Sequence, residues 1–215
     1  MKLDYAKDSK EKRPYEHYLA LYQGMDPIEI SRRIEIPYNE KKRVIHLRLM
    51  GSTYEISHPD YMIRHLEDGT GSYPLENAMN AKILVLRYLV EGNFVPASGK
   101  FVTYREVPWG EVYFRNFQGR CLSRLAFGFG NKIPVFQKVM NKLGAKELTA
   151  GDSSYEFEFV NNLYLRFILW EGDDEFPPSS QILFSDNFSL AFTAEDMAVV
   201  GDVSIGMLKA LEKPV

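Results

Sequence analysis

The spacing of apolar residues predicts helices through the middle of the chain. Between residues 75 and 90 the apolar positions cover much of a helical surface, which predicts a helix that is buried. Two further helices are predicted over residues 111–127 and 134–143. A Gly-Phe-Gly segment separates them, and Gly144 ends the second.

A shorter helical pattern lies near the N-terminus. Residues 15, 19 and 22 are apolar or aromatic and recur at helical spacing, which predicts a helix from Pro14 to about Tyr22. Asp26 followed by Pro27 is typical of an N-cap and the first helical position, so a second helix is predicted to begin there and to end before Pro37.

Before the middle helices, the pattern predicts β-structure. Two short runs, residues 43–50 and 53–56, are joined by a Gly-Ser pair, which is typical of a β-hairpin. A glycine-containing loop is predicted over residues 68–71. A strand is predicted over residues 101–107, ending at Pro108, and Trp109 and Gly110 are predicted to complete a turn.

The last third of the chain changes period. Two strands of a hairpin are predicted over residues 154–159 and 163–170, with the turn at two consecutive asparagines. Another strand is predicted over residues 181–184. Thr193 then predicts the N-cap of a C-terminal helix, with Asp196 at the third helical position.

These elements favour an α+β fold with strands at both flanks and helices in the middle, the helices packed on a mainly antiparallel sheet. No Pro-, Gly- or Ser-rich linker divides the chain, so residues 1–215 are expected to form a single domain. Within it, residues 1–40 are considered as a loosely attached helical arm and residues 41–215 as the α+β core.

Composition and charge narrow the class of protein. The 215 residues are 45% hydrophobic and 26% charged, close to an average soluble protein. The net charge of −3 argues against a nucleic-acid-coating function, which normally needs a basic surface. The charge is also uneven: residues 1–150 hold 23 basic and 17 acidic residues, and residues 151–215 hold 3 and 12. The favoured interpretation is that two oppositely charged layers attract each other; the alternative is a polarised docking or ligand surface.

The sequence predicts a cytoplasmic protein that does not bind membranes. The charged N-terminal segment has no apolar core of a signal peptide, and the longest apolar stretches fall far short of the roughly 20 residues that span a bilayer. A single cysteine, Cys121, excludes an internal disulfide framework and an all-thiolate metal or iron–sulfur site within this chain.

The most distinctive segment is Trp170-Glu-Gly-Asp-Asp-Glu-Phe-Pro-Pro178, called here the acidic loop. It carries four carboxylates, Asp173 and Glu175 among them, between a predicted strand and two stiffening prolines. A solvated turn is the favoured interpretation, and a cation or acid–base site is the alternative. Asp152 precedes the predicted hairpin, so it is expected at the same end of the sheet as the acidic loop, and a turn-capping role is favoured for it.

Basic and aromatic residues alternate along the two middle helices. Arg120 and Arg124 lie four residues apart and share a face, which could bind a small anion such as a phosphate- or carboxylate-bearing cofactor. The alternative is that these arginines face solvent or pair with the acidic last third. Cys121 lies between them and is interpreted as a buried core residue. The four histidines lack any known metal-binding spacing and are interpreted as surface or capping residues, so no metal site is predicted.

The sequence also resembles an uncharacterised prokaryotic domain family of unknown function, met largely in anaerobes. The resemblance covers about residues 25–212, and the segment Trp-x-Gly-Asp-x-Glu-Phe-Pro at residues 170–177 is its most specific part. Further matching motifs are Leu84-x-x-x-Tyr88-Leu89, Pro96-x-x-Gly99-Lys-Phe-Val-x-x-Arg105-Glu-x-Pro108-x-Gly110, Leu143-Gly144, Gly151-Asp152, Ile182-Leu-Phe184 and Glu195-Asp196. Some members of that family follow an iron–sulfur module, sometimes near corrinoid-dependent methyl-transfer systems. This chain lacks such a module and would be a stand-alone version. The resemblance implies Asp152, Trp170, Asp173, Glu175 and Arg105 as a shared set.

Three hypotheses about function follow. The first is a binding module of anaerobic metabolism for a small anionic or cofactor-like ligand or a redox-partner protein, using that shared set with Arg120 and Arg124. The second is a structural or assembly subunit. The third is a hydrolase or lyase based on Asp152, Asp173 and Glu175, with or without a divalent cation. The missing nucleophile–base motif disfavours an enzyme, and a cavity lined by Arg105 or Arg120 and aromatic residues would favour the first hypothesis.

Overall fold

Alternating side chains in the last third of the chain build the centre of the sheet. In the computed structural model, β7 (Ser153–Val160) and β8 (Leu163–Trp170) form the predicted antiparallel hairpin. Tyr155, Phe157 and Phe159 are buried on one face of β7, and the glutamates between them face the other way and are only partly covered. This sheet therefore has one core face and one polar face.

The strands join into one sheet in the order β4-β3-β2-β7-β8-β9-β5, with β1 beside β2 and β6 beside β7, and all these pairings are antiparallel. The remaining strands are β1 (Tyr38–Asn39), β2 (Val44–Leu49), β3 (Ser52–Ser57), β4 (Ile63–His65), β5 (Phe101–Thr103), β6 (Lys146–Leu148) and β9 (Ser179–Ser185). Strand β2 meets β7 through one register pair, Leu49 with Val160, because β6 pairs with the other end of the same edge of β7. This narrow junction connects β1–β4 to the rest of the sheet.

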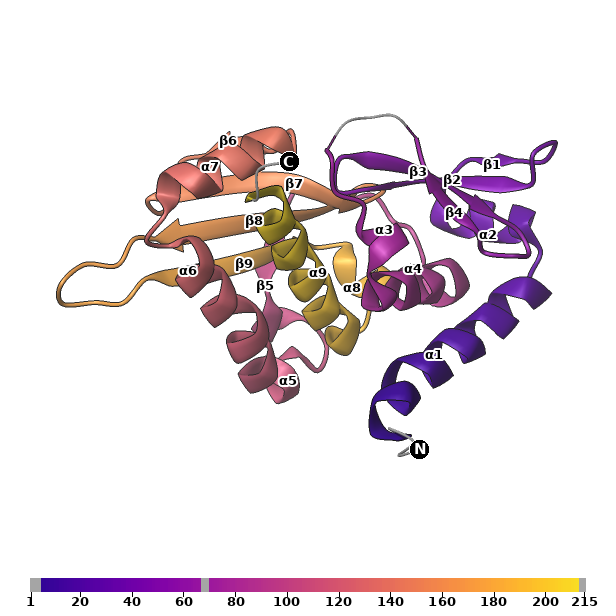
Figure 1. The fold of residues 1–215 in the computed structure, drawn as a ribbon, viewed down its shortest axis with the longest axis horizontal. Helices are drawn as coiled ribbons and strands as arrows, with labels where there is room; N and C mark the ends of the chain where they lie inside the picture. The colour runs from indigo at the N-terminus through magenta and orange to yellow at the C-terminus, as the bar shows by residue number, and fades with distance from the viewer. Residues whose placement is uncertain (1–4, 67–69, 213–215) are drawn as a thin grey trace.

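Helices cover the core face and fill the space between the two parts of the sheet (Figure 1). They are α1 (Tyr5–Gly24), α2 (Pro27–Ile34), α3 (Pro74–Asn77), α4 (Met79–Glu91), α5 (Gly110–Phe117), α6 (Arg124–Phe129), α7 (Ile133–Lys142), α8 (Phe188–Ala191) and α9 (Ala194–Glu212), with a 3₁₀ turn at Tyr104–Glu106 and a π-helical segment at Gln118–Ser123. Helix α9 is central: it packs against α4 on one side and against α5, the π segment and α7 on the other. The chain thus forms a single α+β domain, as the sequence predicts.

The structure describes residues 5–66 and 70–212. The first four residues of the charged N-terminus, and Asp68 and Gly69 of the predicted loop, lie outside that description. Within it, no helix is both long enough and apolar enough to cross a membrane.

Local capping signals are confirmed. The carboxylate of Asp26 accepts a hydrogen bond from the backbone N–H of Ile28 at 2.9 Å, so α2 begins where predicted. At the start of α9, Thr193 Oγ1 accepts from the Asp196 N–H at 3.3 Å, and Asp196 Oδ2 accepts from the Thr193 N–H at 3.2 Å. This reciprocal cap fixes the first turn of α9.

Several predicted bounds are wrong. Helix α1 begins at Tyr5, so Pro14 lies inside it. The helix predicted over residues 75–90 is broken at Ala78, whose extended backbone separates α3 from α4. The strand predicted over residues 101–107 ends at Thr103, because a capping box between Thr103 and Glu106 closes a 3₁₀ turn instead. The helix predicted over residues 111–127 contains the π-helical segment.

The first 40 residues contact the sheet through β1, which pairs with β2, and through Tyr22. Its hydroxyl donates to Ser57 O at 3.1 Å, and its ring meets the imidazole of His58 edge-on. His58 Nε2 lies 3.1 Å from Tyr22 O in the last turn of α1, so His58 caps this helix end, and it is buried there and does not lie on the surface. The division into an arm and a core stays a prediction.

Candidate functional site

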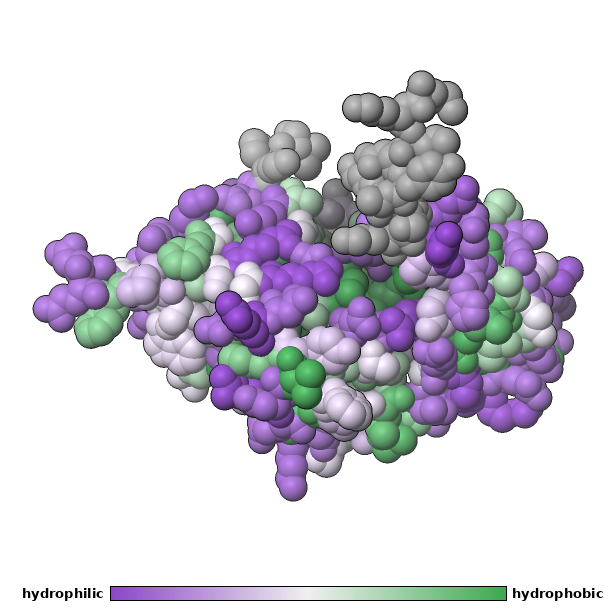
Figure 2. Space-filling model, turned by 90° about the horizontal axis from the view of Figure 1, so that it is seen from below, coloured by the Kyte–Doolittle hydropathy of each residue, from purple (hydrophilic) through white to green (hydrophobic). Residues whose placement is uncertain are grey.

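The tip of the acidic loop projects from the end of the sheet between β8 and β9 (Figures 1 and 2). Asp173 Oδ1 accepts the backbone N–H groups of Glu175 at 2.9 Å and Phe176 at 2.7 Å. These hydrogen bonds stabilise the ionised carboxylate and lower the pKa of Asp173 below its ordinary value. Asp173 therefore acts as the side chain that closes the turn.

Asp152 lies at the same end of the sheet, as expected from the hairpin. Its Oδ2 accepts the Glu171 N–H at 2.7 Å, and its own N–H donates to Leu169 O at 2.9 Å. The carboxylate thus ties the start of the acidic loop to the start of β7. Trp170 is 40% exposed and Phe176 is 67% exposed, so the loop carries aromatic side chains in contact with solvent.

Arg105 is held by neighbours on the surface. Its guanidinium lies 3.8 Å from the centre of the Phe114 ring and 3.7 Å from Glu111 Oε1. Among the described residues, no contact joins Arg105 to the acidic loop. The shared set implied by the resemblance is therefore divided between separate surfaces.

Arg120 and Arg124 converge on one carboxylate, Asp202 of α9. Arg120 Nη2 lies 2.9 Å from Asp202 Oδ2, and Arg124 pairs with Asp202 Oδ1. The amide of Asn80 on α4 donates to Asp202 Oδ2 at 3.4 Å. The predicted common face of the two arginines is thus correct, and it is directed at the acidic last third.

The same attraction recurs across the fold. Basic residues of the first 150 pair with acidic residues of the last 65 in the pairs Arg48–Glu158, Arg87–Asp196, Arg120–Asp202, Arg124–Asp202 and Lys132–Glu212. The uneven charge of the sequence therefore stabilises contacts between neighbouring strands and helices, although each of the more exposed pairs contributes only about 0–1 kcal/mol.

A groove runs between α4 and α9 and contains three adjoining cavities. The first, of about 520 Å³, is lined by residues that include Arg87, Arg120 and Asp196. The second, of about 300 Å³, shares Asn80 with the first and is also lined by Arg124 and Asp202. The third, of about 230 Å³, shares Arg87 and Asp196 with the first.

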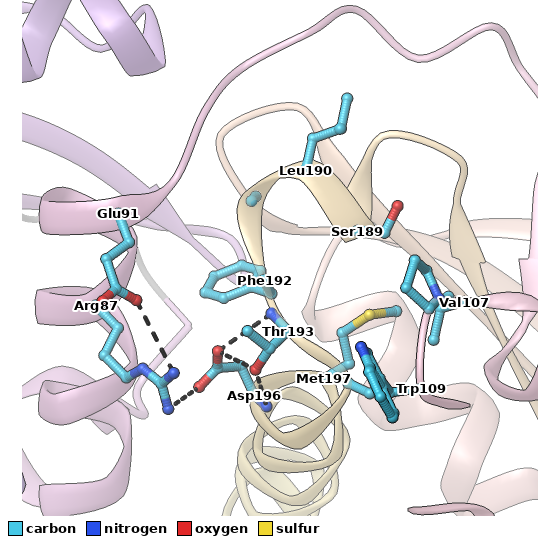
Figure 3. A pocket seen from close by; sticks show the side chains of 13 residues that line it. Arg87, Glu91, Val107, Trp109, Ser189, Leu190, Phe192, Thr193, Asp196 and Met197 are labelled. Carbon is cyan, nitrogen blue, oxygen red and sulfur yellow. Dashed lines mark hydrogen bonds and ion pairs between the residues drawn. The ribbon is translucent and has the colours of Figure 1, made fainter. Parts of the chain in front are cut away.

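The third cavity lies beside the N-terminus of α9 (Figure 3). Asp196 is only 4% exposed. Its Oδ1 forms an ion pair with Arg87 Nη1 at 2.6 Å, and its Oδ2 accepts a hydrogen bond from the Thr193 hydroxyl at 2.6 Å. Burial raises the pKa of Asp196 above its ordinary value, and the contacts with Thr193 and Arg87 only partly offset this. Arg87, Asp202 and this cavity were not predicted from the sequence, whereas Asp196 was identified as a helix-capping residue.

The tryptophan at this cavity has an unusual backbone. The turn Val107–Gly110 is closed by a hydrogen bond from Gly110 N to Val107 O at 2.9 Å, and Trp109 occupies its third position with φ 64° and ψ 1°. These angles are those of a type II turn, where glycine is preferred at this position. A left-handed conformation costs a non-glycine residue about 1–2 kcal/mol.

Cys121 is fully buried, as predicted, and its Sγ donates to Ala198 O at 3.3 Å. Burial raises the pKa of the thiol to about 12, and the nearby Arg120 and Arg124 lower it only in part. Within residues 11–66 and 70–212, no group of three or more histidine, cysteine, aspartate or glutamate side chains is arranged to hold a metal ion.

Native protein is therefore expected to resist alkylation at Cys121. At about pH 8 roughly one thiol in 10,000 is ionised at this pKa, so iodoacetamide should modify the folded chain far more slowly than free glutathione and should modify the unfolded chain fully. Mass spectrometry of timed samples measures this. Alkylation of the native chain at the rate of glutathione would contradict the buried position.

The model of DUF3786, a domain of unknown function, matches residues 26–207. The chain belongs to this family. The match confirms the resemblance to an uncharacterised domain family and covers α4 and α9 as far as residue 207, the two helices that border the groove of this DUF3786 domain. No curated protein and no solved structure matches it.

Proposed function

We propose that this protein is a binding module for a small anionic ligand, held at Arg120 and Arg124 in the groove between α4 and α9. The observation that carries the proposal is the convergence of two guanidinium groups on the single carboxylate of Asp202. Two positive charges against one negative charge leave one positive charge in excess at this point. An anion could therefore bind there without an uncompensated charge.

The cavity of about 300 Å³ beside this cluster suits such a ligand, because Asp202 is the one carboxylate among the described residues that line it. Arg124 lines this cavity, and its size is typical of a small-molecule site. Arg120 lines the cavity of about 520 Å³, whose other charged residues are Arg87, Glu11, Glu195 and Asp196. Both guanidinium groups are partly exposed, and each has more N–H donors than the bond to Asp202 uses. The Asn80 amide lines both cavities and adds a neutral polar group.

Two alternatives have less support. Acid–base catalysis by the acidic loop and Asp152 would need a carboxyl group that exchanges protons near neutral pH, whereas the hydrogen bonds at Asp173 hold its pKa low. The redox-partner part of the sequence hypothesis rests on the resemblance alone. The proposal is therefore confined to a small ligand.

Substitutions at the cluster test this proposal. Pyrophosphate and citrate, titrated at constant ionic strength and followed by calorimetry, are expected to bind the natural chain. Arg120→Met should weaken binding about tenfold, and Asp202→Asn should strengthen it about tenfold, because the competing carboxylate is neutralised; a factor of ten is about 1.4 kcal/mol.

Arg115→Met is the matched control, since Arg115 is an exposed arginine of α5 that lines neither cavity. It should leave binding unchanged. The proposal fails if neither anion binds more than chloride does, or if Arg115→Met weakens binding as much as Arg120→Met.

A further inference from the structure

Trp109 is an exposed aromatic residue on a backbone that favours glycine. Its side chain is 74% exposed, so burial in the core does not account for a tryptophan in a left-handed conformation. Backbone conformations of this kind persist where the surroundings hold them, and they concentrate at ligand-binding sites. The contacts of the turn and the cavity beside Trp109 are therefore the observations from which a role for this residue can be inferred.

The turn that carries Trp109 is held firmly against α9. Tyr104, six residues before Gly110, donates its hydroxyl to Ala194 O at 2.7 Å and stacks on Phe117 with ring centres 3.9 Å apart. A Cβ atom on Gly110 would lie 1.8 Å from Tyr104 O, so the backbone packs tightly at this position. Trp109 is thus fixed at the cavity without being covered.

The cavity of about 230 Å³ has an apolar side and a charged side (Figure 3). Trp109 lies near Val107 and Met197 on the apolar side, and Arg87, Glu91 and Asp196 lie across from it. The volume admits a molecule of one small ring system. An aromatic ring could stack on the exposed face of Trp109 with its polar group directed across the cavity.

The charges on the far side disfavour an anion. Arg87 is 2.6 Å from the carboxylate of Asp196, and the same carboxylate caps the first turn of α9. Glu91 is about half exposed, and its Oε2 is 3.9 Å from Arg87 Nη2, a weak contact. The formal sum of Arg87, Glu91 and Asp196 is one negative charge, and the face of a tryptophan ring also attracts cations.

We propose that this cavity binds a small planar aromatic cation, its ring stacked on Trp109 and its charged N–H group facing Glu91. This site is separate from Arg120 and Arg124 and does not rest on the proposed anion site. Its ligand also has the opposite charge. The two proposals can therefore fail independently.

Three probes of nearly the same shape test the charge of the ligand: benzamidinium, benzamide and benzoate. The indole N–H signal of Trp109 in the ¹⁵N-labelled full chain reports binding, and Trp170→Phe assigns it, because the chain has two tryptophans. We expect saturable shifts with affinity in the order benzamidinium, benzamide, benzoate. Glu91→Gln should weaken benzamidinium about tenfold and leave benzamide unchanged.

Trp109→Gly separates a ligand-binding role from a structural one. It should weaken benzamidinium at least tenfold, followed by calorimetry, while raising the melting temperature by about 2–4 °C through relief of the left-handed strain. Glu35→Gly is the matched control, since Glu35 is exposed at φ 52°; it should raise the melting temperature similarly without changing binding.

Four outcomes would overturn the proposal. They are benzoate binding as tightly as benzamidinium, no saturable shift with any probe, a lower melting temperature for Trp109→Gly, and loss of benzamidinium binding in Glu35→Gly. Arg120→Met should leave benzamidinium binding intact, so a failure of the anion site does not affect this test.

Discussion

Gly110→Ala is expected to lower the free energy of unfolding by about 3 kcal/mol or more. The new Cβ atom would lie 1.8 Å from Tyr104 O and 2.9 Å from Val107 Cγ2, and the nearer atom belongs to the backbone. Backbone cannot move aside as a flexible side chain does, so the turn and the 3₁₀ segment before it would have to shift together. Denaturant unfolding monitored by circular dichroism measures the loss.

Gly119→Ala provides the control in the same region. A Cβ atom at Gly119 would meet nothing within 4 Å, and the residue lies inside the π-helical segment. Alanine there should be neutral or stabilise the chain by about 0.5–1 kcal/mol. If Gly110→Ala unfolded at the same denaturant concentration as the natural chain, the close approach of Tyr104 to Gly110 would be disproved.

Asp196→Ala is expected to destabilise the fold by about 3–5 kcal/mol, because it leaves Arg87 without its closest carboxylate and removes the cap of α9. Asp196→Asn also removes the charge, but its one side-chain oxygen can still accept the hydrogen bonds of either Arg87 or Thr193, so its loss of free energy of unfolding should be smaller. Denaturant unfolding of both variants measures this difference. Equal losses would show that the shape and polarity of this side chain matter little.

The pH dependence gives a second measurement on Asp196. Burial raises the pKa of this carboxyl in the folded state, so the folded chain holds the proton more tightly than the unfolded chain. The stability from this group is complete below the unfolded value of about 3.9 and is lost as the pH rises through the folded pKa. The free energy of unfolding of the natural chain, relative to that of Asp196→Asn, should therefore fall as the pH rises from about 3.9 through the raised pKa of the folded state.

Local patterns predicted the elements but not the groove. The alternation along residues 154–170 was sufficient for the hairpin, because one face of each strand is buried by the same fold that pairs them. Caps at Asp26 and Thr193 were predictable because the donor and acceptor lie within three residues of each other. Two-residue and three-residue strands such as β1 and β6 carry too few positions to show a period.

The candidate site depends on contacts between distant residues. The spacing of Arg120 and Arg124 predicted a shared face, and the uneven charge predicted an acidic partner in the last third. Neither could identify Asp202, which is 78 residues from Arg124. The turn at Trp109 was predicted from Pro108 and Gly110, but the cavity beside it forms only when α8 and α9 pack nearby.

The narrow junction between β2 and β7 has a mechanical consequence. With one register pair between the two parts of the sheet, a small relative rotation there would break few ladder hydrogen bonds. Helix α4 extends from the side of β1–β4, and α9 lies over the other part (Figure 1). Each helix is about 20 Å long or more, at 1.5 Å per residue. A rotation of a few degrees at the junction would therefore change the distance between the far ends of α4 and α9 appreciably. The Arg87–Asp196 ion pair and the Asn80–Asp202 hydrogen bond join the two helices, and together they would hold them at their present separation.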